Sequence, residues 1–496
     1  MKKSSFNRSN REGKFSDRDG AMNSKRWSLI VTILVFLFVF AIRIPHINNS
    51  PCEQGDFWRQ SDTESIARNF IEDGFNIFYP QFNYDGEKPN YVQLEFQITT
   101  FLIALLYKAF GYKYYLARLV PIAFFMGSSI YLYLIVKRYY GNPAAWYAVI
   151  AYAIMPMNIF YTRAIMPESA ALFFFIGAFY YFIKWYDNEK LSTLFISALF
   201  TCLSISQKTP TIFIGLAMIF LLIKKYRFRF LLKWELWIFA LISLLPNIIY
   251  IQWSRSIAEF DFVTNIGLFH IIPKSLKAFS NIESYIFAGG EIVAAVSSGL
   301  IVLIIAGLID VKWDHDYPIL FWAAAMLLEA MAIAAVIKLR YYFIFITPIA
   351  AIWAGKSLGK LGNSKKCIFS VFIGLSILTI WNFIDCKSFF EEKDNILKQA
   401  EVIRMYTKED DLVVIGTLEP TLLNQSRRSG WRANIKYYKE IPIGAEKELN
   451  YLIEKGAKYF SPLGGYIYGD DGSYRKYLDE NFEKLGDKDY FIYKLR

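Results

Sequence analysis

The sequence is poor in the residues that hold metal ions and covalent cross-links. Its 496 residues include only four cysteines and three histidines. The cysteines are Cys52, Cys202, Cys367 and Cys386. Their spacing matches neither a metal-binding pattern nor a disulfide framework, and the histidines lie far apart along the chain. We therefore expect no cysteine–histidine metal centre and no fold held together by disulfides.

The sequence also predicts no cleavable secretion signal. Residues 1–26 form a basic leader, and the apolar run that follows, residues 27–44, has the length of a membrane span. No small-residue cleavage site comes after that run. We interpret residues 1–26 as a disordered cytoplasmic leader and residues 27–44 as a first span that is retained.

Basic residues are in excess, but they form no continuous basic face of the kind that nucleic-acid binding needs. The 55 Lys and Arg residues outnumber the 44 Asp and Glu residues, which gives a net charge of +11. They gather in short clusters between apolar runs, which is the positive-inside pattern of membrane proteins. We therefore exclude nucleic acid as a partner.

Apolar residues dominate the chain: 55% are hydrophobic and 18% are aromatic. About 20 consecutive apolar residues cross the hydrocarbon core of a bilayer. The runs of roughly that length are residues 27–44, 115–136, 144–160, 169–185, 191–207, 210–223, 234–253, 291–310, 317–337, 341–356 and 367–384. The sequence therefore predicts an all-α polytopic membrane domain over residues 27–384, with about eleven transmembrane helices.

The positive-inside rule orients these spans. With the leader inside, the basic stretches at 137–138, 184–190, 224–229 and 356–366 all fall in inner loops. This holds only if residues 94–110, which are apolar but short, lie along the outer interface. The N-terminus is then cytoplasmic, and the polar loops lie on the outer face.

The first outer loop, residues 45–114, is crowded with carboxylates, basic residues and aromatics, beginning with Asp56. Ser61 and Glu64 have the spacing of a capping box, and Gly74 suits a helix end. We expect a short amphipathic helix that begins at Ser61 and rests on the membrane, with Asp56 just before it. The alternative is a purely structural interfacial helix whose charges are solvated.

Ionisable residues also occur at the outer mouths of other spans. An acid such as Glu168 is costly there unless it faces protein or water, although it also suits the positive end of a helix dipole. Arg59, Lys88 and Lys208 would suit a lipid phosphate, or they extend to phospholipid headgroups.

A further basic and aromatic pair, Arg340 and Tyr341, precedes a later span. It suits the same outer site or an interface anchor.

After residue 385 the hydropathy falls. Residues 411–416, 458–461 and 490–495 are typical of strands and residues 445–455 of a helix. The sequence therefore predicts a small soluble α/β domain over residues 385–496, on the outer face.

Six short motifs occur in the order known from one family. They are Asp56 followed by Arg59, Glu87-Lys88-Pro89, Lys137-Arg138-Tyr139-Tyr140-Gly141, Met166-Pro167-Glu168, Gln207-Lys208-Thr209-Pro210, and Arg340-Tyr341-Tyr342 with Pro348. In these motifs, residues 27–360 resemble the integral-membrane GT-C glycosyltransferases, in the branch of protein O-mannosyltransferase-like and aminoarabinose-transferase-like enzymes. The chain departs from the family pattern at Phe57, Glu168 and Thr209, where that family more often has Glu, Asp and Gly.

The resemblance implies a GT-C-like fold and transfer of a sugar from a dolichyl- or undecaprenyl-phosphate donor to a hydroxyl. The acceptor class is open among a lipid-linked glycan, a cell-surface polysaccharide and a protein. The implied location is the outer side of the plasma (inner) membrane, and the implied reaction is a single displacement that inverts the sugar. The implied roles are Asp56 as base, Glu168 as its partner or the acceptor's, and Arg59, Lys88, Lys208, Arg340 and Tyr341 in donor binding. No cofactor is certain, and Mg²⁺ or Mn²⁺ is left open, because one carboxylate from each loop is a thin ligand set.

Two other functional classes fit parts of the sequence. A lipid or sugar-lipid transporter also has many spans, but no internal repeat or pair of Gly/Pro-broken spans is found here. A non-catalytic assembly or adhesion protein would depend on the domain after residue 385 and tolerate loss of Asp56.

Overall fold

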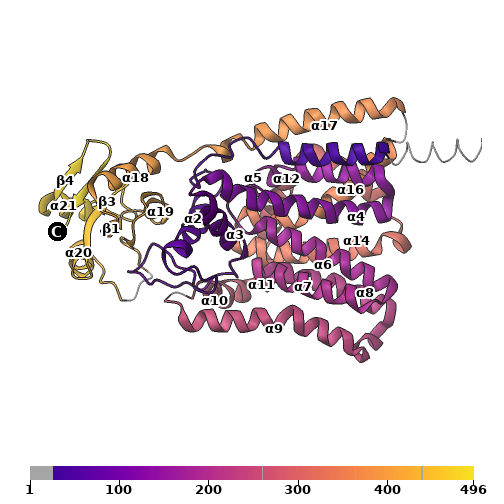
Figure 1. The fold of residues 1–496 in the computed structure, drawn as a ribbon, viewed down its shortest axis with the longest axis horizontal. Coiled ribbons are helices and arrows are strands. Elements are labelled where there is room, and N and C mark those ends of the chain that lie inside the picture. The colour runs from indigo at the N-terminus through magenta and orange to yellow at the C-terminus, as the bar shows by residue number, and fades with distance from the viewer. Residues whose placement is uncertain (1–25, 260, 363–364, 437–439) are drawn as a thin grey trace, which may run out of the picture.

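The computed structural model describes residues 26–259, 261–362, 365–436 and 440–496. The predicted leader, apart from its last residue, lies outside this description. Figure 1 shows a helical bundle at one end, a small sheet domain at the other, and α2 (Phe57–Glu72) with its loops between them. The predicted fold class, a polytopic helical protein with a small α/β domain at its C-terminus, is confirmed.

The bundle is built from apolar helices that are mostly three turns or longer. They are Arg26–Ala41, α4 (Tyr114–Ile154), α6 (Glu168–Asn188), α7 (Leu191–Gln207), α8 (Ile214–Tyr226), α9 (Trp234–Ile257), α12 (Ile282–Val296), α13 (Ser298–Ile309), α14 (Trp313–Glu329), α16 (Thr347–Leu361) and α17 (Lys365–Asp385). Shorter helices link them: α3 (Ile98–Phe110), α5 (Pro156–Tyr161), α10 (Phe262–Asn265), α11 (Ile272–Ala278) and α15 (Ala335–Ile337). The linking turns are Thr209–Phe213, Arg227–Leu232, Ile266–Ile271, Ala330–Ala334, Arg340–Ile346 and Lys387–Phe390.

Fewer helices pass a length and composition test for a span than the eleven predicted. Six described helices are long and apolar enough, or seven if α12 and α13, which meet at 98°, form one broken span. Two predicted spans, 115–136 and 144–160, are the arms of α4, which turns back at Gly141. The φ of Gly141 is +84°, a conformation that favours glycine, and Phe125 on one arm stacks on Tyr152 of the other at 4.7 Å between ring centroids.

The basic loops predicted to lie inside meet at one end of the bundle. Arg138 forms an ion pair with Asp187, at the C-terminal end of α6. Lys356 pairs with Asp316 at 2.7 Å, and Tyr140 donates a hydrogen bond to the same carboxylate at 3.0 Å. These contacts join loops that are far apart in sequence.

At the other end of the bundle, α2 begins four residues earlier than predicted. Asp56 is its N-cap, and the carboxylate of Asp56 accepts a hydrogen bond from the backbone N–H of Arg59 at 3.3 Å. Ser61 is inside the helix and donates to the carbonyl of Trp58 at 3.0 Å. The capping-box prediction is therefore wrong, because Asp56 already satisfies a free amide of the first turn.

Helix α2 is also not the predicted amphipathic helix that has a single buried face. Residues 60–70 are all buried, polar and apolar alike, because α2 packs between α3 and the C-terminal domain. The short helix α3 has 13 residues and is too short for a span, in agreement with the prediction for residues 94–110.

The C-terminal domain is a five-stranded sheet with the strand order β2-β1-β3-β5-β4. The strands are β1 (Leu412–Ile415), β2 (Gly430–Arg432), β3 (Ala457–Ser461), β4 (Glu483–Gly486) and β5 (Phe491–Lys494). Strand β1 is parallel to β2 and β3, with Val414 opposite Trp431 and Phe460. Strand β5 is antiparallel to β3 and β4.

Helices cover both faces of this sheet. On the face toward α2, α18 (Asp394–Tyr406) and α19 (Thr421–Ser426) pack with Val413 and Ile415. On the other face, α20 (Ala445–Glu454) and α21 (Ser473–Asn481) pack with Val414. The alternation of Val413, Val414 and Ile415 between the two cores is the period of two of a strand.

Candidate active site between α2 and the helical bundle

A cavity of about 380 Å³ lies between α2 and the ends of the bundle helices. Four residues predicted from the sequence line it: Asp56, Arg59, Lys208 and Tyr341. These residues come from segments that are far apart in sequence. Asp56 and Arg59 lie at the start of α2, Lys208 follows α7, and Tyr341 lies in the segment before α16. Glu168 does not line the cavity but lies directly behind Lys208.

Asp56 sits at the amino end of α2, on the cavity wall and half-buried. Burial raises the pKa of Asp56 to about 6, against the opposing effect of the hydrogen bond from the Arg59 backbone; the charge of Glu168 raises this pKa further. The carboxylate is therefore ionised at neutral pH yet more basic than an ordinary aspartate. Such a group is suited to accept a proton.

Near Asp56, two basic and two acidic side chains form a connected set of ion pairs. Arg59 pairs with Glu95 at 2.7 Å; Lys208 pairs with Glu168 at 2.8 Å and lies 3.5 Å from Glu95. Although burial opposes it, the charges of Arg59 and Lys208 lower the pKa of Glu95 to about 2. Arg59 keeps a buried Nε–H with no hydrogen-bond partner among the described residues. The network, named here the open cluster (Asp56, Arg59, Glu95, Glu168 and Lys208), therefore holds two cations in place at the cavity.

Two tyrosine rings contact the ammonium group of Lys208. The ammonium of Lys208 lies 4.7 Å from the ring centroid of Tyr341 and 5.0 Å from that of Tyr342. Both rings line the cavity. Cation–π contacts of this kind hold a lysine in position without neutralising its charge.

The structure does not bring two of the predicted donor-binding residues into the cavity. Lys88 pairs with Asp73 at 2.8 Å and donates to Asn69 at 3.0 Å, on the far end of α2. Arg340 is exposed and lies 3.3 Å from Glu291, although its neighbours Leu339 and Tyr341 line the cavity.

Sequence reasoning missed several residues of the site, of which Glu95 and Asp62 are the most informative. Glu95 belongs to residues 94–110, for which the sequence predicts only a helix along the interface. Asp62 lies between Ser61 and Glu64, the two residues of the predicted capping box, but its side chain is buried on the cavity wall. Burial raises the pKa of Asp62 to about 7, although the charge of Arg59 and hydrogen bonds from Asn424 and Tyr84 oppose this.

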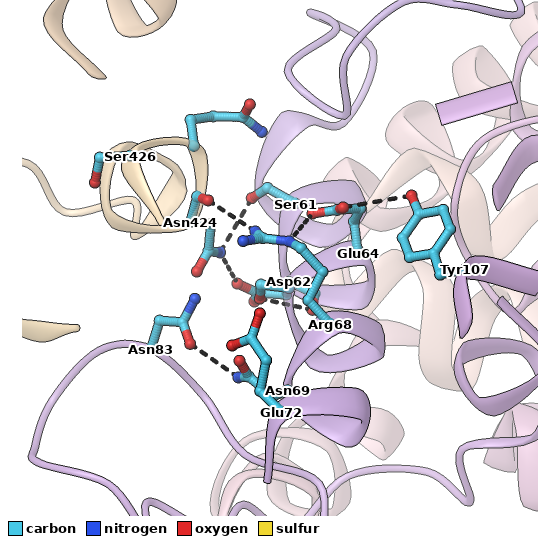
Figure 2. Close-up of polar contacts among 12 residues, drawn as sticks. Ser61, Asp62, Glu64, Arg68, Asn69, Glu72, Asn83, Tyr107, Asn424 and Ser426 are labelled. Atoms are coloured by element: carbon cyan, nitrogen blue, oxygen red, sulfur yellow. Dashed lines mark hydrogen bonds and ion pairs between the residues drawn. The ribbon is translucent and has the colours of Figure 1, made fainter. Parts of the chain in front are cut away.

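Asp62 also joins the cavity to the C-terminal domain. Figure 2 shows Asp62 and Arg68 of α2 facing Asn424 of α19. The Asn424 side chain donates to Asp62 at 2.9 Å, and Arg68 donates to the Asn424 carbonyl at 2.8 Å. Arg68 is in turn fixed by Glu64 at 2.9 Å. These buried contacts hold the C-terminal domain against α2, the helix that Asp56 caps.

A second group of opposite charges lies close to the first but lines none of the cavities described here. Glu53 forms ion pairs with Arg118, at 3.0 Å, and with Arg163. All three side chains are at most 1% exposed. Arg118 also donates to Gln60 at 3.0 Å. We name Glu53, Arg118 and Arg163 the closed cluster.

The described residues do not offer a ligand set for a divalent metal. No group of three or more His, Cys, Asp or Glu side chains among them could hold an ion. Of the acids at or behind the cavity, Glu95 and Glu168 are already paired with Arg59 and Lys208. Asp62 already accepts hydrogen bonds from Asn424 and Tyr84, which leaves Asp56. Mg²⁺ and Mn²⁺ prefer about six oxygen ligands, so these residues do not fit them, and no step below uses a metal.

A second, apolar cavity of about 520 Å³ lies between α7, α8 and α9. Ile212 and Phe213 line both this cavity and the first. Its walls are almost entirely aliphatic and aromatic side chains, such as Leu216 and Trp237. The cavity that holds the charged residues therefore adjoins a second cavity whose walls are apolar.

Comparisons with known proteins bear on the family and the fold of the chain. Residues 98–253 match the family described as dolichyl-phosphate-mannose-protein mannosyltransferase. No protein of curated function matches the sequence. The fold is similar to that of ArnT from Cupriavidus metallidurans bound to undecaprenyl phosphate, with a TM-score of 0.67, 10% identity, and 95% of this chain and 98% of that chain covered.

Two further solved structures share the fold. AglB, an oligosaccharyltransferase from Archaeoglobus fulgidus in complex with an inhibitory peptide and a dolichol-phosphate, has a TM-score of 0.56 and 12% identity, over 95% of this chain and 74% of that chain. The arabinofuranosyltransferase AftD from Mycobacteria has a TM-score of 0.55 and 12% identity, and this chain spans 40% of its length. The resemblance to GT-C glycosyltransferases is thereby confirmed, and the chain has the polytopic fold of that class.

Proposed function

We propose that the protein is a glycosyltransferase that moves a sugar from a polyprenyl-phosphate donor to an acceptor hydroxyl. The reaction takes place at the outer face of the plasma membrane, the side to which the positive-inside rule assigns Asp56. The acceptor is a glycan, a lipid or a protein. The family match and the fold support the reaction class, and the geometry of the open cluster supports the roles below.

The observation that carries the proposal is the composition of the two adjoining cavities. One holds a basic carboxylate, Asp56, opposite two fixed cations, Arg59 and Lys208. The other is apolar and shares Ile212 and Phe213 with the first. A polyprenyl-phosphate sugar has the same order of parts: a hydroxylated sugar, an anionic phosphate and a long apolar chain. ArnT, which has this fold, was solved with undecaprenyl phosphate bound.

The chemistry follows from this placement. The Asp56 carboxylate accepts the proton of the acceptor hydroxyl, whose oxygen attacks the anomeric carbon of the donor sugar. The bond between that carbon and the phosphate oxygen breaks, and the phosphate leaves with the electron pair. Arg59 and Lys208 offset the charge that develops on the leaving phosphate. Attack from the side opposite the phosphate inverts the anomeric centre.

The acids of the open cluster keep the two cations where the phosphate needs them. Glu95 and Glu168 each pair with a cation that lines the cavity. Glu168 is thus a positioning residue, and it also raises the pKa of Asp56. Lys88 and Arg340, which lie outside the cavity, have no part in this mechanism.

The test is transfer of radiolabelled sugar in proteoliposomes that contain the purified full-length protein and an extract of cell envelope as acceptor. The donors are polyprenyl-phosphate mannose, glucose, galactose and aminoarabinose. The matched control is Asp73→Asn, the same chemical change on an acid at the other end of α2. We expect product from the wild type and from Asp73→Asn, and none from Asp56→Asn.

A transporter would behave differently in the same vesicles. It would move the labelled sugar-lipid across the bilayer without breaking its phosphate bond, and Asp56→Asn would leave that movement intact. Translocation without product in the wild type would therefore overturn the proposal.

A further inference from the structure

A third cavity, of about 190 Å³, lies between the C-terminal domain and the start of α2. Phe57 forms its wall on the α2 side. The other walls come from Lys393 and Asn395 at the start of α18, from Thr417 and Glu419 after β1, and from Leu463 after β3. Phe57 follows Asp56 directly, so the first turn of α2 separates this cavity from the candidate active site.

The place of this cavity in the sheet is the place where open α/β sheets bind ligands. Strand β1 lies between β2 and β3 and is parallel to both. The connection from β1 to β2 uses α19 on one face, and the connection from β2 to β3 uses α20 on the other. The chain thus switches faces between β1 and β3, and a crevice opens beyond their carboxyl ends. Thr417, Glu419 and Leu463 follow those two strand ends.

The side chains around the cavity are free to bind a ligand. Glu419 and Asn395 have no hydrogen bond or ion pair with any other described side chain. Within the described part of the chain, the ammonium of Lys393 contacts only the ring of Phe57, at 5.2 Å from the ring centroid. Thr417 is buried and donates to the Glu419 carbonyl at 2.8 Å, which fixes the loop that presents Glu419.

This set of groups matches the donors and acceptors of a carbohydrate. Carboxylates only accept hydrogen bonds, ammonium groups only donate them, and amides do both, as do the hydroxyls of a sugar. The charges of Lys393 and Glu419 cancel, which favours a neutral ligand over an anionic one. The ring of Phe57 offers an apolar surface for the C–H face of a sugar ring.

The size and rigidity of the cavity indicate one unit of a longer ligand. Pockets for whole small molecules enclose about 300–1,000 Å³. Thr421 of α19 receives a hydrogen bond from Ser61 of α2 at 3.2 Å, and Asn424 donates to Asp62 at 2.9 Å. These hydrogen bonds fix α19 against α2, and Figure 2 shows the one between Asn424 and Asp62.

We propose that this cavity binds a neutral carbohydrate unit of the acceptor and so places the acceptor hydroxyl beside Asp56. This rests on the proposed function, because it names the acceptor class of that same reaction. A peptide acceptor is the competing class, and the experiment decides between them.

The experiment measures binding to the full-length protein in nanodiscs by saturation-transfer NMR. The probes are methyl glycosides and short oligosaccharides of glucose, mannose, galactose and N-acetylglucosamine, together with a Ser/Thr-containing peptide. The wild type is compared with Glu419→Gln and Asn395→Ala. The control is Glu401→Gln, the same change at an exposed position of α18. Each variant is checked for an unchanged thermal unfolding midpoint.

We expect at least one saccharide to bind the wild type and Glu401→Gln equally, and Glu419→Gln and Asn395→Ala about tenfold more weakly. Asp56→Asn should bind it as the wild type does, because Asp56 does not line this cavity. Binding of no saccharide, equal binding to all variants, or binding of the peptide alone would overturn the inference. Saccharide binding without any sugar transfer would instead count against the proposed function and leave the binding site in place.

Discussion

The open and closed clusters are built from the same kinds of side chain, and Glu53 of the closed cluster lies only three residues before Asp56. The two clusters differ in whether a ligand in a cavity can reach their charged groups. The carboxylate of Glu53 is shared by two arginines, and none of these three residues lines a cavity described here, whereas four of the five residues of the open cluster line a cavity of about 380 Å³. Ion pairs that are closed off from every cavity hold a fold, and ion pairs that border a cavity can also do chemistry.

The closed cluster should show its role as a loss of stability. Glu53→Gln leaves Arg118 and Arg163 buried without a countercharge, which should lower the free energy of unfolding by about 3–5 kcal/mol. Thermal unfolding of the purified protein, followed by tryptophan fluorescence, measures this. A midpoint that matches that of the Asp73→Asn control would show that the closed cluster does not hold the fold.

Substitutions in the Lys208–Glu168 pair should affect stability and activity differently. Lys208→Met alone leaves Glu168 buried and unpaired and should cost about 3 kcal/mol of stability, whereas Lys208→Met with Glu168→Gln should recover most of it. Transfer should be lost in both, because the cation that faces the phosphate is gone. The measurement is a double-mutant cycle on unfolding midpoints and transfer rates. Transfer restored together with stability would remove Lys208 from the mechanism.

The pH dependence should follow Asp56. Its raised pKa of about 6 means that the base is ionised above that pH and protonated below it. Activity should therefore fall as the pH is lowered through 6, by about tenfold per unit below the pKa. Initial rates of kcat/KM between pH 5 and pH 8 measure this. A profile that stays flat down to pH 5 would contradict the assignment of Asp56 as base.

The smallest effect should come from Lys88. Its partner Asp73 is partly exposed and its ammonium is away from the cavity, so Lys88→Met should change stability by less than about 0.5 kcal/mol and transfer by less than about twofold. The same assays measure both. A large loss of transfer would restore the donor-binding role that the Glu-Lys-Pro motif predicts.

The sequence predicted much of the architecture, because apolar run length and basic loops are local signals. It also predicted that Asp56 and Lys208 would share an outer site, since each lies in a polar segment that the topology brings to one face. It did not predict Glu95 as the partner of Arg59, because 36 residues separate them and only tertiary packing decides the pair.

Local patterns misled where packing overrode them. The spacing of Ser61 and Glu64 fits a capping box, yet Asp56 caps the helix and Glu64 pairs with Arg68 instead. Asp62 shows the same limit. Its role as the link between the cavity and Asn424 depends on a domain about 360 residues away, as its hydrogen bond to Asn424 shows.

The most direct test of the account is the transfer rate of Asp56→Asn beside Glu53→Gln, each expressed per folded molecule. Asp56→Asn should keep the wild-type unfolding midpoint and lose about 10²- to 10⁴-fold of the rate, the usual contribution of a general base. Glu53→Gln should lose stability but keep the rate of its folded fraction. Wild-type transfer by folded Asp56→Asn would contradict the central claim that the open cluster carries the chemistry.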